Sequence, residues 1–204
     1  MTARLVLATH NAHKVGELRA ILDGVAGLRA EEVVGAGDVG APDVLEDGVT
    51  FAENALLKAR AIARHTHLAA VADDSGLAVD VLGGAPGIFS ARWAGRHGDD
   101  RANLELLLAQ LVDVREQHRG AQFVCAAALV TPDGVEHVKQ RVLRGTLLTA
   151  PRGDGGFGYD PILRPDGETR TCAELTPAEK NAISHRGRAL RALAPHIAAV
   201  LARD

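Results

Sequence analysis

The transition that decides the fold class lies in residues 4–22, which read RLVLATHNAHKVGELRAIL. Residues 4–8 (RLVLA) predict a buried strand, because an apolar run of strand length follows Arg4. Asn11 can cap a helix, and apolar residues then recur at helical spacing through residue 22. A strand that passes directly into an amphipathic helix is typical of α/β proteins, so we expect this fold class.

Strand and helix patterns alternate along the rest of the chain. Thr50 is followed three residues later by Glu53, the signature of a capping box at a helix start. Thr176 can cap a short helix with Pro177 at its first position and Glu179 at its third. We expect the polar cluster at residues 73–76 to end a short strand and residues 132–134 (PDG) to form a hairpin turn. The predicted strands are residues 31–34, 68–72, 122–131 and 136–148, and the predicted helices start at Thr50, Asp99 or Asp100, Thr176 and Ser184.

The composition excludes several classes of protein. Hydrophobic residues make up 47% and charged residues 24% of the 204 residues, unlike a disordered tail or a coiled coil. The apolar run of residues 124–130 is far shorter than the roughly 18 residues that span a bilayer. A net charge of −3 offers no broad basic field for nucleic acid, and only two cysteines favour a cytoplasmic protein. The N-terminus does not resemble a signal peptide.

Some residue types are scarce, so their positions are informative. The chain has 36 alanines and 19 arginines but only 4 lysines, 3 serines and 6 aromatic residues. Three of the lysines, Lys14, Lys58 and Lys180, fall in segments that are rich in other polar residues. These segments are candidates for chemistry, although small numbers also cluster by chance.

The first candidate segment, residues 9–14, joins the first strand to the first helix. Free backbone N–H groups at a helix start form an anion site, and Lys14 adds a charge suited to a phosphate. An ordinary capped helix with a solvated lysine explains the same residues. His10 and His13 have no third ligand nearby in the sequence, so no metal site is expected there.

The second candidate is a loop and the helix that follows it. Glu46 lies in the loop, where its carboxylate could bind a hard cation. Asn54 and Lys58 are four residues apart and therefore share one face of the helix. The alternative is a surface loop followed by a solvated helix face.

The third candidate is the pair of adjacent carboxylates, Asp73 and Asp74. At the end of a buried strand such a pair is costly unless a positive charge lies beside it, and Mg²⁺ commonly fills this role in phosphate sites. A solvated turn is the alternative. Ser75 raises the option of a serine hydrolase, but the G-x-S-x-G elbow is absent and the neighbouring acids disfavour an alkoxide.

The fourth candidate is the glycine-rich segment GDGGFGYDP, residues 153–161. It contains G-x-G-x-x-G spacing, but it lacks the preceding strand and following helix that a dinucleotide-binding motif requires. We expect a loop that brings its backbone near a ligand, with Phe157 as a stacking surface and Asp160 as a hydrogen-bond acceptor. The alternative places Phe157 in the hydrophobic core.

The fifth candidate lies at the junction of two predicted helices, in residues 174–190. Lys180, His185 and Arg186 supply positive charge and donors there, which suits a phosphate or the carbonyl edge of a base. A basic, solvated helix start is the alternative.

Taken in order, the segments match one family. The motifs TxN(x)₂K, TFxENAxxKA, ADDSGLxVDxLxGxPGxxSAR, GGFGYDP and AELTxxEKNxISHRGxAL run from Thr9 to Leu190. In these motifs the chain resembles the non-canonical purine nucleoside triphosphate pyrophosphatases, also called XTP/dITP diphosphatases or inosine triphosphate pyrophosphatases. The resemblance implies one α/β domain over residues 1–204, with an elongated mixed β-sheet flanked by helices and two lobes around a central cleft.

The resemblance also implies a reaction. ITP, dITP and XTP would be cleaved to the nucleoside monophosphate and pyrophosphate by a Mg²⁺-dependent, cytoplasmic homodimer that clears deaminated purines. Asp74 would be the catalytic residue, and Asp74 and Glu46 the metal ligands. The implied substrate-binding residues are Thr9, His10, Asn11, Ala12, His13, Lys14, Asn54, Lys58, Ser75, Phe157, Gly158, Tyr159, Asp160, Lys180, His185 and Arg186. Two rivals stay open, a nucleotide-binding regulator without hydrolysis and a pyrophosphatase for modified pyrimidines.

Overall fold

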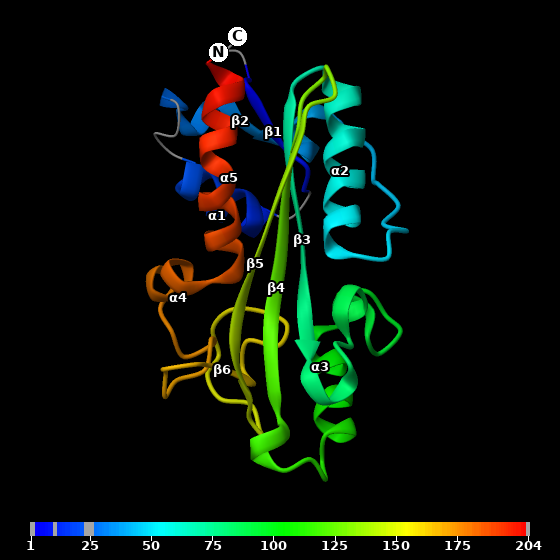
Figure 1. The fold of residues 1–204 in the computed structure, drawn as a ribbon, viewed down its shortest axis with the longest axis vertical. Helices are drawn as coiled ribbons and strands as arrows, with labels where there is room; N and C mark the ends of the chain where they lie inside the picture. Colours follow the sequence, from blue (N-terminus) through cyan, green and yellow to red (C-terminus); the bar gives the residue numbers. More distant parts are fainter. Residues whose placement is uncertain (1–2, 10–11, 23–26, 203–204) are drawn as a thin grey trace. The chain divides into compact units, whose positions relative to one another are not determined.

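The structure is a computed structural model and describes residues 3–9, 12–22 and 27–202. These residues contain one mixed sheet with strand order β2-β1-β3-β4-β5-β6 (Figure 1). β1 runs parallel to β2 and β3, whereas β5 and β6 are antiparallel. The elements are β1 Leu5–Leu7, α1 Ala12–Leu22, β2 Val33–Gly35, α2 Phe51–Thr66, β3 Ala69–Val79, α3 Asp100–Gln110, β4 Gly120–Val130, β5 Glu136–Leu147, β6 Leu163–Pro165, α4 Pro177–Ile183 and α5 His185–Leu201.

The predicted class, a mixed sheet flanked by helices, is confirmed. The chain divides into two compact units: unit 1 is Met1–Asp74, Cys125–Arg141 and Arg186–Asp204, and unit 2 is Ser75–Val124 and Val142–His185. A single two-lobed domain with a central cleft stays a prediction. Among the described residues, none of the helices is both long and apolar enough to cross a membrane.

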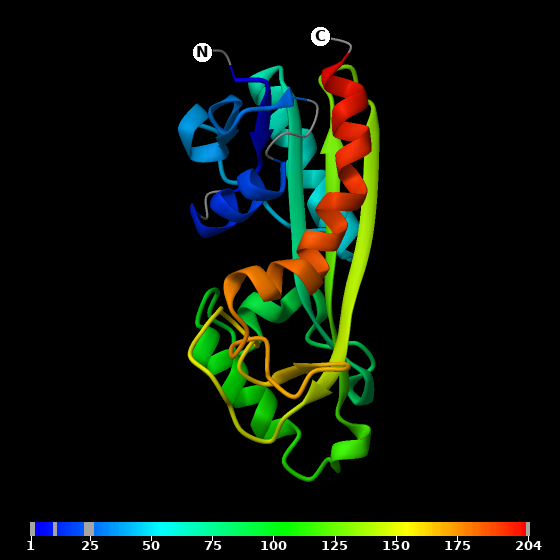
Figure 2. The same cartoon turned by 90° about the vertical axis from the view of Figure 1, so that its left-hand side faces the viewer.

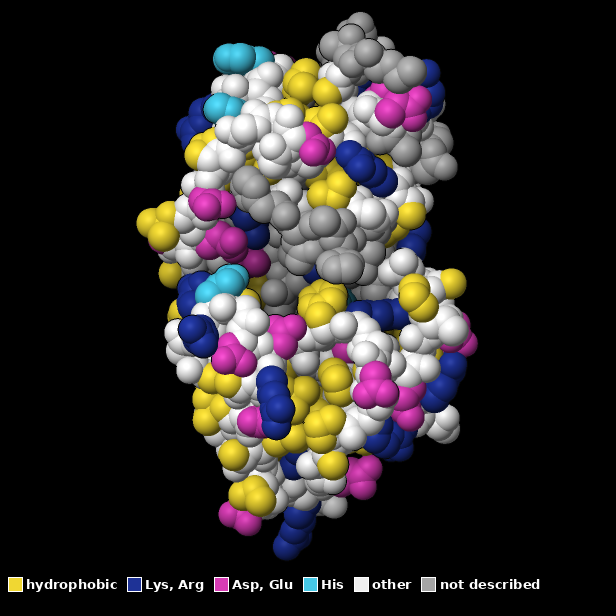
Figure 3. All heavy atoms as spheres, turned by 180° about the vertical axis from the view of Figure 1, so that it is seen from behind, with side chains coloured by type: hydrophobic (Ala, Val, Ile, Leu, Met, Phe, Trp, Pro, Cys, Tyr) yellow, Lys and Arg dark blue, Asp and Glu magenta, His cyan; other side chains and the backbone are white. Residues whose placement is uncertain are grey.

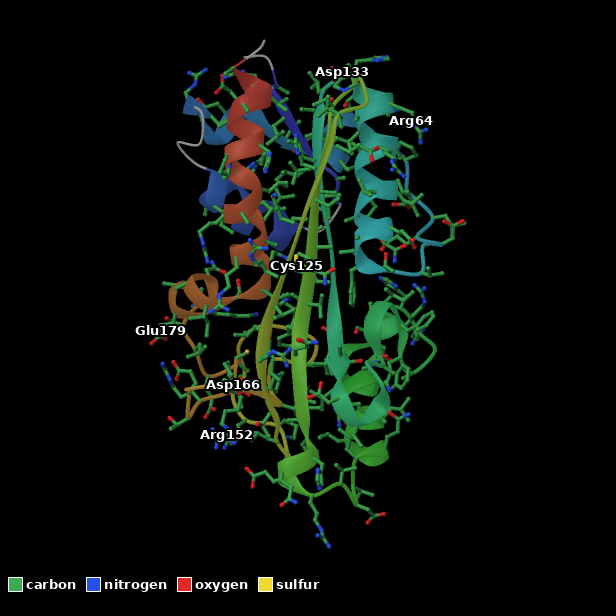
Figure 4. All side chains as sticks on the ribbon, in the orientation of Figure 1. Arg64, Cys125, Asp133, Arg152, Asp166 and Glu179 are labelled. Carbon is green, nitrogen blue, oxygen red and sulfur yellow. The ribbon has the colours of Figure 1, made fainter. Side chains whose placement is uncertain are left out.

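In unit 1 the two faces of the sheet carry two separate hydrophobic cores. Alternate residues of a strand point to opposite faces, so Leu5 and Leu7 of β1 enter one core and Val6 the other. The first core packs against α1 and α5 and the second against α2, which lie on opposite sides of the sheet (Figures 1 and 2). Cys125 is fully buried in the first core, and Asp133 lies at the tip of the β4–β5 turn (Figure 4).

In unit 2 the core gathers around α3, the ends of the long strands and β6. At its edge lies the buried guanidinium of Arg119, which is 1% exposed. It donates to the carbonyl oxygens of Leu111, Leu147 and Leu148 at 2.7 to 2.9 Å. Burial lowers the pKa of Arg119, and the carbonyl acceptors compensate the buried charge. The sequence indicated neither this anchor nor β6.

One strand prediction was wrong in an instructive way. The strand expected at residues 68–72 does not end at the polar cluster, because β3 continues from Ala69 to Val79. Asp73 and Asp74 therefore lie within the strand and point to opposite faces of the sheet. Each carboxylate has a partner on its own side, described below, so the polar pair does not interrupt the strand.

The predicted helix starts are largely confirmed. Thr50 and Thr176 are the N-caps of α2 and α4, and Asp99 is the N-cap of α3. The capping box is complete at Thr176. At α2 the Glu53 carboxylate instead accepts a hydrogen bond from the backbone N–H of Val49 at 2.7 Å, one residue before the cap. The loop before α2 is thereby tied to the first turn of the helix.

Candidate active site

In unit 1 a single lysine lies between two carboxylates. Lys58 Nζ is 3.0 Å from Glu46 Oε2 and 3.6 Å from Asp74 Oδ1. The three residues come from α2, the loop before it and β3. With all three ionised the cluster carries one net negative charge, so it retains capacity for a further cation.

The environment of this cluster changes the acidity of its members. Burial raises the pKa of Asp74 above its usual value, against the opposing effect of the Lys58 charge. Burial also lowers the pKa of Lys58, but Asp74, Glu46 and Asp73 outweigh it, so the pKa of Lys58 is raised. Lys58 thus stays protonated while Asp74 becomes a stronger base than an exposed aspartate.

Asp73 has a different partner, on the other face of β3. Its Oδ2 atom accepts a hydrogen bond from Arg186 Nε at 3.1 Å, and the two residues are 4% and 6% exposed. The two adjacent carboxylates therefore do not share one cation. The sequence did not predict this pair, because its members are 113 residues apart. It indicated only that a carboxylate buried in a strand needs a positively charged partner, without identifying that partner.

Among the described residues, no group of three or more His, Cys, Asp and Glu side chains could hold a metal ion. Glu46 and Asp74 are two carboxylates that could hold a metal in unit 1 if oxygens from substrate or water completed its ligands. Such a donor set suits Mg²⁺, which is typically held by one or two carboxylates together with phosphate oxygens and water.

In unit 2 a second lysine pairs with one carboxylate. Lys180 Nζ donates to Asp160 Oδ2 at 2.6 Å, and the backbone N–H of Phe157 donates to the same oxygen at 2.7 Å. Lys180 Nζ also lies 4.9 Å from the centre of the Phe157 ring, in a cation–π contact. Phe157 is 51% exposed, so the alternative that placed it in the core is wrong.

Other residues of unit 2 have structural contacts. The Tyr159 hydroxyl donates to the Ser90 carbonyl at 2.9 Å, and burial raises the pKa of Tyr159 strongly. The Ser90 hydroxyl accepts from Leu77 N at 2.9 Å and donates to Gly87 O at 2.6 Å. Ser90 thus makes a structural contact within unit 2.

His185 also belongs to unit 2. It is 9% exposed, and its ring stacks on Phe123 with centroids 5.1 Å apart. Its predicted role in base recognition remains a prediction, as does that of Arg186, whose Nε bonds Asp73.

The glycine loop of residues 153–158 opens no helix, in agreement with the rejection of the dinucleotide motif. Its backbone packs against the backbone of Ala173 instead. A Cβ at Gly155 would lie 2.7 Å from the carbonyl oxygen of Ala173, and Gly155 N donates to that oxygen at 3.1 Å. Gly153 has φ +82° beside the same backbone. These glycines therefore permit a close approach within the protein, which accounts for them without a ligand.

The loop also lines a pocket of about 500 Å³ within unit 2. Gly158 N donates to Asp100 Oδ2 at 2.8 Å, which joins the loop to the first turn of α3. Hydrophobic side chains gather on this face of unit 2, with basic and acidic groups among them (Figure 3). The lining residues are Asp100, Arg101, Leu104, Glu105, Leu108, Pro151, Gly158 and Pro161.

The predicted phosphate segment is described only in part. His10 and Asn11 lie outside the described residues, as do the side chains of Ala12, His13 and Lys14. Thr9 follows β1, and Ser75 follows Asp74 in β3; both are partly exposed. Their contacts with a substrate remain predictions.

Comparison with known proteins agrees with the resemblance. The model of the Ham1 family matches residues 5–196. The dITP/XTP pyrophosphatase of Streptomyces coelicolor is 67% identical over 198 residues, covering 97% of this chain and 98% of the relative. That of Frankia alni is 60% identical over 206 residues, covering 97% and 98%.

Solved structures give the same result. A nucleoside-triphosphatase (dITP/XTP pyrophosphatase) of Mycobacterium abscessus is 53% identical with a TM-score of 0.76, covering 94% of this chain and 99% of that one. A HAM1 protein of Coxiella burnetii is 38% identical with a TM-score of 0.85, covering 100% of both chains. With a family model that spans most of its length and relatives at this identity, the chain belongs to the Ham1 family.

Proposed function

We propose that this protein hydrolyses deaminated purine nucleoside triphosphates, ITP, dITP and XTP, to the monophosphate and pyrophosphate. The observation that carries the proposal is the cluster in unit 1, where Lys58 lies between Glu46 and Asp74 and one negative charge is left over. The names of the relatives, dITP/XTP pyrophosphatases, support this choice of substrates.

Glu46 and Asp74 would hold a divalent metal, which we take to be Mg²⁺. Both are carboxylates, the donors that this hard cation prefers, and the lysine between them prevents their mutual repulsion. A bound Mg²⁺ would withdraw negative charge from the phosphate oxygens.

Asp74 would orient the attacking water or accept its proton. Its burial favours this role, because a carboxylate with a raised pKa is a stronger base near neutral pH. Lys58 would keep Asp74 oriented, since its ammonium group faces both carboxylates. Lys14 and Lys180 would offset charge on the triphosphate, together with the backbone N–H groups of residues 9–14.

The base would stack on Phe157, whose ring is half exposed and held beside Lys180. His185 or Arg186 would donate to the 6-oxo group, and Asp160 or a backbone carbonyl would accept from N1–H. Adenine presents the opposite pattern, which leaves polar groups unpaired and costs on the order of 10⁴-fold in discrimination.

The protein would act as a homodimer on the cytoplasmic nucleotide pool, where removal of deaminated purines keeps them out of nucleic acid. Neither a nucleic acid nor a membrane would be a partner.

Pyrophosphate release from ITP, XTP, dITP, GTP, ATP and modified pyrimidine triphosphates, with and without Mg²⁺, tests this function. We expect release from the first three, dependent on Mg²⁺, and little from ATP. Equal turnover of ATP and ITP would refute the account of base recognition. Preference for modified pyrimidines would support the pyrimidine rival, and nucleotide binding without turnover would support a regulator.

A further inference from the structure

Asn54 is a buried residue of α2 whose side chain makes a contact at each end. It is 2% exposed. Its Oδ1 atom accepts from the backbone N–H of Gly48 at 2.9 Å, and its Nδ2 donates to Asp74 Oδ2 at 3.2 Å. A backbone N–H can only donate and an ionised carboxylate can only accept, so one orientation of the amide satisfies both contacts. Asn54 therefore connects the loop before α2 to β3.

The loop meets this amide at a position that requires glycine. A Cβ at Gly48 would lie 2.7 Å from Asn54 Oδ1 and 2.8 Å from Glu53 Cβ. The backbone can approach the amide only because this atom is missing. Glu46 is two residues before Gly48, so the amide that binds Asp74 also fixes the loop that carries Glu46.

We infer that Asn54 is a positioning residue that holds Glu46 and Asp74 in the arrangement a divalent metal requires. The inference rests on the proposed function, in which these two carboxylates bind the metal. It differs from the expected role of Asn54 as a substrate contact, and the 2% exposure of the residue, with each polar atom of its amide already bonded within the protein, favours the positioning role. Groups that hydrogen-bond to metal ligands typically contribute about 10- to 100-fold to metal affinity or activity.

Glu53 provides a matched control on the same helix. Its carboxylate accepts from Val49 N, the next backbone amide of the same loop, and the residue is exposed. Replacing Glu53 removes an anchor of the loop and leaves the bond from Asn54 to Asp74 in place. Replacing Asn54 removes a loop anchor and the bond to Asp74 together.

The experiment compares wild type, Asn54→Leu, which is nearly isosteric, and Glu53→Ala. Calorimetry without nucleotide measures Mg²⁺ binding, and hydrogen exchange follows the backbone of residues 46–50. For Asn54→Leu we expect Mg²⁺ affinity to fall about 10- to 100-fold and kcat to fall with it, while KM for dITP at saturating Mg²⁺ changes less than about threefold. For Glu53→Ala we expect faster exchange in the loop but a loss of Mg²⁺ affinity below about threefold. Equal Mg²⁺ affinity in the two variants would overturn the inference.

A second measurement covers the case in which Asn54→Leu does not fold. In wild type the side-chain amide signal of Asn54, observed by ¹⁵N NMR, should shift during a Mg²⁺ titration with the Kd found by calorimetry. A signal that is unchanged at saturating Mg²⁺ would overturn the inference.

The two proposals fail in different ways. Wild type that binds Mg²⁺ but releases no pyrophosphate from dITP refutes the proposed function alone. Wild type that turns over dITP while the Asn54 and Glu53 variants bind Mg²⁺ equally well refutes the positioning role alone.

Discussion

The two lysine clusters differ in charge balance. In unit 1 Lys58 faces two carboxylates, Glu46 and Asp74, so the ionised cluster carries one net negative charge. In unit 2 Lys180 faces the single carboxylate of Asp160, so that pair is neutral, and it lies beside the half-exposed ring of Phe157.

The difference fits the proposal of a different ligand for each cluster. A surplus negative charge attracts a cation, so the unit 1 cluster suits a metal and the chemistry on phosphate. The half-exposed aromatic face of Phe157 suits a flat group, so the unit 2 cluster suits the base, while Lys180 would face the charge of the triphosphate. Changes in unit 1 should therefore lower kcat, and changes in unit 2 should raise KM.

The largest effect is expected from Asp74→Asn. This change removes the proposed base and neutralises the surplus charge of unit 1, so kcat for dITP should fall by about 10²- to 10⁴-fold. Steady-state kinetics at saturating Mg²⁺ measure it, and the KM for dITP should change little. Near-normal turnover by this variant would refute the role of Asp74.

The neighbouring change, Asp73→Asn, should act on stability. It removes the carboxylate charge that faces the buried guanidinium of Arg186, which we expect to cost about 3–5 kcal/mol in the free energy of unfolding. Urea denaturation measures this loss. A stability equal to that of wild type would show that the ion pair between Asp73 and Arg186 contributes little. It would contradict the assignment of a stabilising role to Asp73 and a catalytic role to Asp74.

A smaller effect is expected from Phe157→Ala in unit 2. Stacking of a base on an aromatic ring contributes about 1–3 kcal/mol, so KM for dITP should rise roughly tenfold. Because Phe157 is 51% exposed, the melting temperature should remain close to that of wild type. A fall in kcat without a change in KM would contradict the division between the two clusters.

The smallest effect concerns the capping box of α4, the helix that carries Lys180. The backbone N–H of Thr176 donates to Glu179, and this bond, with those from the Thr176 hydroxyl and Arg170, lowers the Glu179 pKa to about 2 (Glu179 is labelled in Figure 4). A carboxylate with a lowered pKa in the folded state stabilises it above the unfolded value near 4.5, and this contribution disappears as the pH falls through 2.

Glu179→Gln should therefore have a lower urea midpoint than wild type at pH 7. The gap should narrow as the pH falls from 4.5 toward 2. A gap that does not depend on pH would contradict a role for the charge.

The sequence predicted the parts of the fold that depend on local signals. Thr50 and Thr176 indicate helix starts because their side chains can cap a helix. The run of apolar residues before residue 9 indicates β1. The course of β3 was not predictable, because Asp73 and Asp74 look like a strand end until their partners are known. Those partners, Arg186 and Lys58, come from distant parts of the chain.

In the candidate site, too, residue types were predictable from the sequence and tertiary contacts were not. Glu46, Lys58 and Asp74 were identified from their residue types, and the structure brings them together. The sequence could not indicate that Asn54 is bonded at both ends within the protein, because this depends on where the backbone of Gly48 lies. Residue type thus indicated the chemistry, while tertiary contacts decided which residues position others.

The central claim, that unit 1 directs a metal-dependent cleavage of the triphosphate, is tested most directly by ³¹P NMR of dITP turnover by wild type with Mg²⁺. The account predicts that dIMP and pyrophosphate form in equal amounts and that chelation of the metal stops the reaction. Orthophosphate together with dIDP, or turnover that continues after chelation, would contradict it.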